Sequence, residues 1–144
     1  MTSVPTAGSA VEGYAGDLTV HQAWQLVEEG QAVLVDVRTE VEWRFVGVAD
    51  LSALGAEVTF VEWARVDGGP NAEFVSQVVE AAQGRPTVFL CRSGQRSVSA
   101  ARAVTQAGAG PAYNVLDGFE GALDSAGHRG GTGWRAAGLP WRQS

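Results

Sequence analysis

The chain has 144 residues, of which 45% are hydrophobic and 18% are charged, so its size and composition are those of one soluble globular domain that needs no disulfide or structural metal. The formal net charge of −6 argues against a general binder of nucleic acid or of an anionic membrane, and no apolar run approaches the roughly 20 residues that span a bilayer. The one cysteine excludes an intrachain disulfide, which fits a reducing, cytoplasmic compartment.

The N-terminal segment, residues 1–16, is predicted to be a flexible tail, because small and polar residues dominate it and it lacks the basic patch and apolar stretch of a signal peptide. Residues 17–144 then form a single domain. Its first helix follows Thr19, which suits the N-cap position, and Gly30 is placed to end it. One face of this helix is apolar and consists of Val20, Ala23, Trp24 and Val27.

Strands and helices are predicted to alternate along the rest of the chain. Short apolar runs indicate buried strands at residues 32–35, near 59, at 86–91 and at 112–118, the last one ending at Asp117-Gly118. Helices are expected over residues 71–84, capped by Asn71, over 97–108, and briefly over 134–137. Because the strands are apolar on both faces and alternate with helices, the pattern favours an α/β fold with a mostly parallel sheet.

Charged and polar residues follow directly after these strands. The segments concerned are DVRTE (36–40), EWARV (62–66), CRSGQRS (91–97) and LDGFEG (116–121). Ligands of an open parallel sheet bind at the carboxyl ends of its strands, so we expect the four segments to gather at one edge and to form the functional site.

Cys91 is the sole thiol, and it lies where an apolar strand meets the turn before a helix. The first N–H groups of a helix lack intrahelical partners, and together with the helix dipole they hold anions and favour a thiolate. Arg92 and Arg96 add positive charge, and Gly94 allows a tight turn. A lone cysteine after a strand is usually an inert core residue, but such a residue does not require this turn.

Five stretches of the sequence together resemble the rhodanese, or sulfurtransferase, domain. They are VLVDVR (33–38), Glu42-Trp43, VFLCRSGQRS (88–97), NVLDG (114–118) and GWRAAGLPW (133–141). The resemblance extends from about Leu18 to Trp141, and the Cys-Arg-Ser-Gly-x-Arg-Ser loop is its most specific part. It implies a rhodanese-like three-layer fold, with a five-stranded, mostly parallel sheet flanked by helices.

The resemblance also implies a reaction and the residues that perform it. Cys91 would accept sulfane sulfur from a small anionic donor such as thiosulfate, become a persulfide, and pass the sulfur to cyanide or a thiol without a cofactor or metal. A sulfur-relay protein is a further candidate partner. Asp36 and Arg38 would support the loop from the end of their strand. The loop residues that would bind substrate are Arg92, Ser93, Gly94, Gln95, Arg96 and Ser97.

The sequence departs from the family's pattern in two places. The segment 47–52 lacks the histidine that the family usually has after the Glu-Trp pair. A glycine-rich insertion at about residues 120–133, with His128 and Arg129, separates the last strand from the Gly-Trp segment. We predict that it is either a flap or docking surface beside Cys91 or a surface insertion without function. No set of potential ligand residues has the spacing of a metal site.

Two other classes of function compete with sulfur transfer. A phosphatase or arsenate reductase uses a similar loop, but it has a longer run between cysteine and arginine than the four residues that separate Cys91 from Arg96. A non-catalytic binding or sulfur-carrier module of the same fold is the other alternative, and the presence of Cys91 and both loop arginines counts against it. The sequence therefore predicts a stand-alone sulfurtransferase enzyme.

Overall fold

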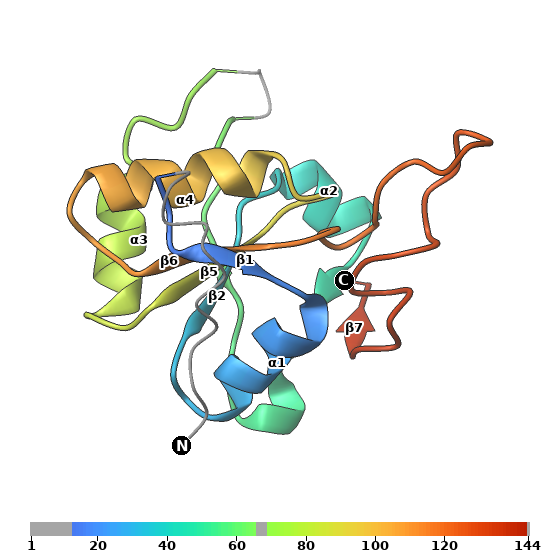
Figure 1. Ribbon diagram of the computed structural model, residues 1–144, viewed down its shortest axis with the longest axis horizontal. Coiled ribbons are helices and arrows are strands. Elements are labelled where there is room, and N and C mark those ends of the chain that lie inside the picture. Colours follow the sequence, from blue (N-terminus) through green and yellow to red (C-terminus); the bar gives the residue numbers. More distant parts are fainter. Residues whose placement is uncertain (1–12, 66–68, 144) are drawn as a thin grey trace.

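The fold is built on one five-stranded parallel sheet. A computed structural model describes residues 13–65 and 69–143. All neighbouring strands of the sheet run parallel, which confirms the predicted fold class (Figure 1). In spatial order the strands are β1 (Gly16–Leu18), β6 (Ala112–Val115), β5 (Thr87–Leu90), β2 (Val33–Asp36) and β4 (Thr59–Phe60).

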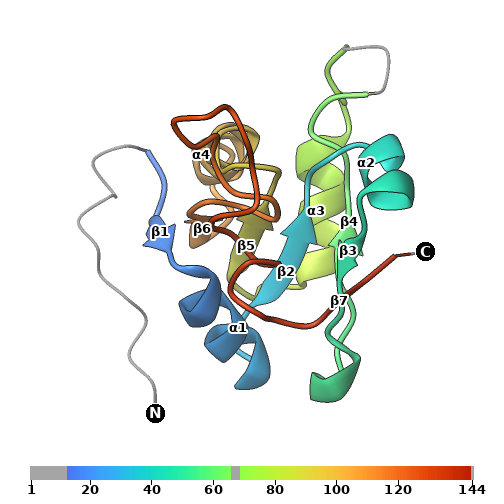
Figure 2. The same cartoon turned by 90° about the vertical axis from the view of Figure 1, so that its right-hand side faces the viewer.

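Helices cover both faces of the sheet and give three layers. Helix α1 (Val20–Glu28) lies on one face, and α3 (Phe74–Ala82) and α4 (Arg96–Gln106) lie on the other (Figure 2). Side chains alternate along each strand, so Leu34 and Leu90 join the core under α1 while Val35 and Cys91 join the core under α3 and α4. No helix in the described ranges is long and apolar enough to cross a membrane.

Of the two N-terminal helix caps that the sequence predicts, the structure confirms one. Thr19 caps α1 as predicted, since its side chain accepts from the N–H of Gln22 and the Gln22 side chain accepts from the Thr19 N–H. The prediction of Asn71 as the cap of α3 is wrong, because the helix begins at Phe74 and its N-cap residue, Glu73, makes no side-chain cap. Asn71 instead accepts from the Glu73 N–H and orders the turn before the helix.

Several short elements were not predicted from the sequence. They are α2 (Glu40–Phe45), the 3-10 turn η2 (Ser52–Leu54), and the antiparallel ribbon of β3 (Val48–Ala49) and β7 (Trp141–Arg142). Helix α2 buries none of its residues, so it has no apolar periodicity to detect. The short helix predicted over residues 134–137 is a turn. The Trp134 indole N–H donates to the carbonyl of Pro140, which follows this turn, at 2.7 Å.

The packed domain begins earlier than predicted. Tyr14 is buried, and Gly16 already belongs to β1, where it pairs with Tyr113. Residues 14–16 are therefore part of the domain rather than of the tail, because β1 completes the edge of the sheet beside β6. The rest of the predicted tail, residues 1–12, lies outside the described residues.

Candidate active site

The segments that follow the parallel strands meet at one edge of the sheet, as the sequence analysis expected. Val37, after β2, donates its N–H to the Leu90 carbonyl at the end of β5. Trp63, after β4, donates to the Val37 carbonyl, and Phe119, after β6, donates to the Cys91 carbonyl at 2.8 Å. Cys91 lies at the centre of this edge and is only 1% exposed.

The Cys91 sulfur receives its contacts from its own loop. The Gly94 N–H donates to Sγ at 3.1 Å, and the Ser97 hydroxyl lies at 3.1 Å from Sγ. Gly94 has a φ of +96°, which lets the chain curl around the sulfur. Helix α4 starts at Arg96 without a side-chain cap, so the positive end of its dipole lies next to the loop. This arrangement places an N–H donor and the positive end of a helix dipole where they would stabilise a bound anion.

The turn after β6 supports the Cys91 loop from behind. The N–H groups of Phe119 and Glu120 donate to the Cys91 and Arg92 carbonyls at 2.8 Å and 2.9 Å. Between these contacts Gly118 has a φ of +59° and lies directly against the loop backbone. A Cβ at Gly118 would meet the Cys91 carbonyl oxygen, and it would lie 2.7 Å from the Arg92 oxygen. This close approach requires glycine.

We expect Gly118→Ala to lower the free energy of unfolding by about 2–4 kcal/mol, because the new methyl must displace the backbone of the Cys91 loop. The alkylation rate of Cys91 should change as well. The matched control is Gly127→Ala, since Gly127 has a φ of +79° but has nothing within 4 Å of the position that the new methyl would take. Denaturant unfolding measures both variants, and equal losses for the two would show that backbone strain alone, and not the contact with the loop, accounts for the effect.

Asp36 and Arg38 form a buried ion pair beside the loop, and both side chains are 0% exposed. The Arg38 guanidinium donates to both carboxylate oxygens of Asp36, at 2.7 Å to Oδ2 and 3.0 Å to Oδ1, and to the Gly47 carbonyl at 2.8 Å. It also lies 4.3 Å from the ring centre of Phe119. The pair therefore joins the end of β2 to the segments before β3 and after β6, without a hydrogen bond to Cys91.

Arg96 is held by a residue that the sequence analysis did not select. Its two terminal nitrogens donate to the two carboxylate oxygens of Glu42, at 2.7 Å and 2.9 Å. Burial alone would raise the pKa of Glu42, but the hydrogen bonds from Arg96 and Thr39 and the charge of Arg96 lower it below its ordinary value. The hydrogen bond to Glu42 raises the pKa of Arg96. Much of the positive charge expected from Arg96 is thus balanced, while Arg92 is exposed.

Residues 19–124 match the sequence model of the rhodanese-like domain. The chain belongs to this family. An uncharacterized protein of Rickettsia conorii is 37% identical over 81% of this chain and 88% of its own length. The crystal structure of Rv0390 from M. tuberculosis is 61% identical, with a TM-score of 0.84, over 91% of this chain and 99% of that one.

Two more distant structures share the fold of this rhodanese-like domain. A thiosulfate sulfurtransferase from Pseudomonas aeruginosa superposes with a TM-score of 0.59 at 20% identity, over 94% of this chain and 21% of that one. RPA3614 from Rhodopseudomonas palustris, described as a possible tyrosine phosphatase, superposes with a TM-score of 0.58 at 22% identity, over 99% of each chain. At these identities the likeness establishes the fold alone.

The glycine-rich insertion of this rhodanese-like domain projects from the body of the molecule as a loop, drawn in orange (Figure 1). Near its base, Arg129 donates to the Gly121 carbonyl at 2.8 Å, and the Gly130 N–H donates to the Glu120 carbonyl at 3.0 Å. At the tip, the Asp124 carboxylate accepts from backbone N–H groups, including that of the exposed His128 at 2.8 Å. The insertion is thus ordered by its own hydrogen bonds, and its role as a flap or docking surface stays a prediction.

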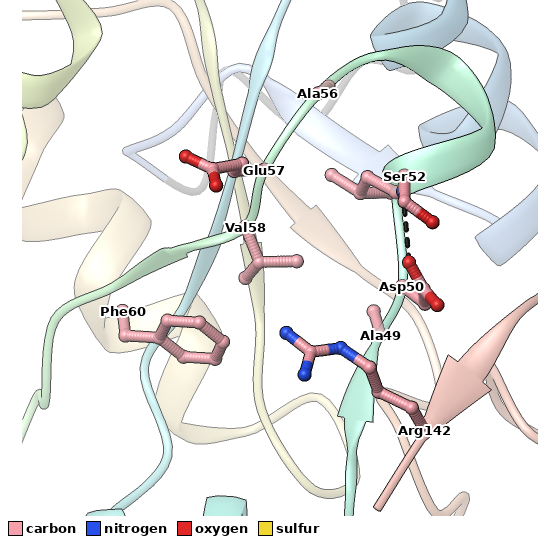
Figure 3. Close-up of a pocket in the computed structure, with 9 residues that line it drawn as sticks. Ala49, Asp50, Ser52, Ala56, Glu57, Val58, Phe60 and Arg142 are labelled. Atoms are coloured by element: carbon pink, nitrogen blue, oxygen red, sulfur yellow. Dashed lines mark hydrogen bonds between the residues drawn. The ribbon is translucent and has the colours of Figure 1, made fainter. Parts of the chain in front are cut away.

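A cavity of about 510 Å³ lies away from the Cys91 loop, between the β3–β7 ribbon and β4 with the segment that leads into it (Figure 3). The Arg142 guanidinium extends into it toward Phe60, and Asp50 on its rim accepts from the Ser52 N–H at 2.9 Å. None of its lining residues belongs to the Cys91 loop. Within the described ranges, no group of three or more His, Cys, Asp or Glu residues is arranged to hold a metal ion.

Proposed function

We propose that this protein is a sulfurtransferase that carries sulfane sulfur on Cys91. The Cys91 thiolate attacks the outer sulfur of a donor such as thiosulfate, a sulfur–sulfur bond forms to Cys91, and sulfite leaves with the electron pair of the broken bond. Cyanide or a thiolate then attacks the outer sulfur of the persulfide, and Cys91 leaves as the thiolate. No other redox partner is needed, because the donor and the acceptor balance the electrons.

The observation that supports this proposal most directly is the position of the Cys91 sulfur. It accepts the Gly94 N–H at 3.1 Å beside the uncapped start of α4. Donors in that place stabilise the attacking thiolate and the terminal anion of the persulfide. The burial of Cys91 keeps bulk water away from the persulfide. Arg92 and Gln95 are exposed on the rim of the loop, where an incoming donor would meet them.

The alternatives receive less support from the loop. A phosphatase needs an arginine that is free to hold the phosphoryl oxygens, whereas both terminal nitrogens of Arg96 bind Glu42. A purely non-catalytic module does not require the N–H donor on the sulfur. We place the reaction in the cytoplasm, because the one thiol of the protein has to stay reduced. Its partners would be a small anionic donor and, as acceptor, a thiol or cyanide.

Intact-protein mass spectrometry after incubation with thiosulfate tests the proposal. The expected result is a gain of one sulfur atom that cyanide removes. A different outcome is that the folded protein, with a titratable thiol, gains no sulfur from thiosulfate or from a protein persulfide. If it then hydrolyses aryl phosphates or reduces arsenate, the phosphatase or arsenate reductase hypothesis replaces the sulfurtransferase hypothesis.

Glu42 is expected to reduce the attraction of the site for anionic donors. Glu42→Gln keeps a similar shape and removes the negative charge that balances Arg96, so the KM for thiosulfate should fall roughly three- to tenfold at low salt. A neutral donor should be unaffected. The matched control is Glu40→Gln, which removes a charge paired with Arg44 on the exposed face of α2. A thiosulfate KM that rises or stays constant in Glu42→Gln would contradict this role.

A further inference from the structure

A chain of hydrogen bonds leads from Cys91 to the first strand of the sheet. Ser97 Oγ lies 3.1 Å from Cys91 Sγ and donates to Oδ1 of Asn114 in β6. Asn114 Nδ2 donates to Oδ1 of Asp17 in β1 at 3.0 Å. The Tyr14 hydroxyl donates to the same Asp17 oxygen at 2.8 Å. Neither Asp17, Asn114 nor Tyr14 has a part in the sulfur chemistry described above.

The direction of these hydrogen bonds follows from the Asp17 carboxylate, with which the series of hydrogen bonds ends. An ionised carboxylate only accepts hydrogen bonds, so Asp17 fixes the Asn114 amide with Nδ2 toward Asp17 and Oδ1 toward Ser97. The amide oxygen also only accepts, so it takes the single hydroxyl proton of Ser97. Ser97 therefore presents a lone pair to Cys91 and accepts the proton of the thiol.

Burial makes this arrangement hard to exchange for another. Ser97 is 0% exposed and Asn114 is 2% exposed, so bulk water does not compete for their polar atoms. If the Ser97 proton turned toward the sulfur, the Asn114 oxygen would lose its partner inside the core, which is costly. The Gly94 N–H, at 3.1 Å, is then the donor that the resting sulfur retains.

We propose that Asn114, oriented by Asp17, is a positioning residue that holds Ser97 as the hydrogen-bond acceptor of the Cys91 thiol. This contact favours the protonated, less reactive form of Cys91 while no substrate is bound. The inference rests on the proposed function for its biological meaning, since it concerns the same thiol. Its measurable content is the reactivity of Cys91 itself, which does not depend on any sulfur donor.

Charged groups that lie near the Cys91 loop must stay constant in the test. Arg96 from α4 interacts electrostatically with Cys91, with Asp36 at the end of β2, and with Glu42 of α2. Arg38 is bound to Asp36. The substitutions chosen below leave all four side chains in place, so a change in reactivity reports on the Ser97 contact or on Asp17.

The test is the rate of Cys91 alkylation by iodoacetamide as a function of pH. In Asn114→Leu an apolar side chain of similar size replaces the amide, and the freed Ser97 proton can stabilise the thiolate. The pH profile should shift to lower pH, and the rate at neutral pH should rise roughly three- to tenfold. Asp17 is half-buried, so Asp17→Asn should disturb the fold less than Asn114→Leu does. It should shift the profile in the same direction but by a smaller amount, because the Asn114 amide can then rotate by half a turn and exchange its oxygen and nitrogen.

Two controls separate positioning from general disturbance. Thr87→Val removes another buried hydroxyl, at the start of β5, the strand that leads to Cys91. This hydroxyl has no hydrogen-bond partner among the described residues, so its loss should leave the profile unchanged. In a Ser97→Ala background, Asn114→Leu should have no further effect, since the two act through one contact. Unchanged or slower alkylation in both Asn114→Leu and Asp17→Asn, or a gain that persists without Ser97, overturns the inference. A wild-type protein that takes up no sulfur would contradict the proposed function alone.

Discussion

Cys91→Ser should abolish the gain of one sulfur atom from thiosulfate, to below the detection limit of intact-protein mass spectrometry. An alcohol is a far weaker nucleophile than a thiolate and forms no stable persulfide. Because Cys91 is the only cysteine of the chain, no second thiol can take over its role. The serine is close in size, so the buried site under α4 should remain folded.

The wild-type protein provides the control for this prediction in two ways. Its mass gain should disappear with cyanide, which attacks the outer sulfur and regenerates the thiol. Alkylation of the Cys91 thiol before the incubation should also prevent the mass gain. A sulfur adduct that survives in Cys91→Ser, with the same far-UV circular dichroism as wild type, would place the chemistry on another residue and remove Cys91 from the mechanism.

Asp36→Ala should cost about 3–5 kcal/mol of unfolding free energy, a larger loss of stability than we expect for Gly118→Ala. Asp36 and Arg38 are both fully buried, and the substitution leaves the Arg38 guanidinium charged without its carboxylate partner. The Arg38 contact with Gly47 and its stacking on Phe119 should loosen, so the site edge should be perturbed as well. Urea denaturation followed by tryptophan fluorescence measures the effect.

A surface ion pair is the matched control for that experiment. Glu40 and Arg44 are linked at 3.2 Å on α2, with side chains 66% and 65% exposed, so Glu40→Ala should cost only about 0.5 kcal/mol or less. Replacing both buried partners together, as Asp36→Ala with Arg38→Met, should recover part of the loss, since no unpaired charge remains. If Asp36→Ala cost no more than Glu40→Ala, the buried pair would not hold the end of β2 in place.

The local sequence determined the elements that carry the site. Apolar runs of strand length alternate with helical periodicity, and this pattern alone predicts a parallel α/β sheet whose strand ends meet at one edge. The position of Cys91 after β5 and of Gly94 in the turn could also be predicted, because both depend on residues within one short segment. The same is true of Thr19 and α1, since a cap and its helix are neighbours in the chain.

The tertiary structure decided which residues from distant segments meet around that thiol. Glu42 and Arg96 are 54 positions apart, and Asn114 and Asp17 are 97 positions apart. Their contacts arise only when the strands take the order β1-β6-β5-β2 and the register that sets Asp17 beside Asn114. Side-chain periodicity reports burial but not the identity of the neighbour across the sheet. For that physical reason the sequence predicted Cys91 as the reactive group of the site, whereas Glu42, which balances the charge of Arg96, and Asn114, which orients the hydrogen bond of Ser97, appeared only in the folded chain.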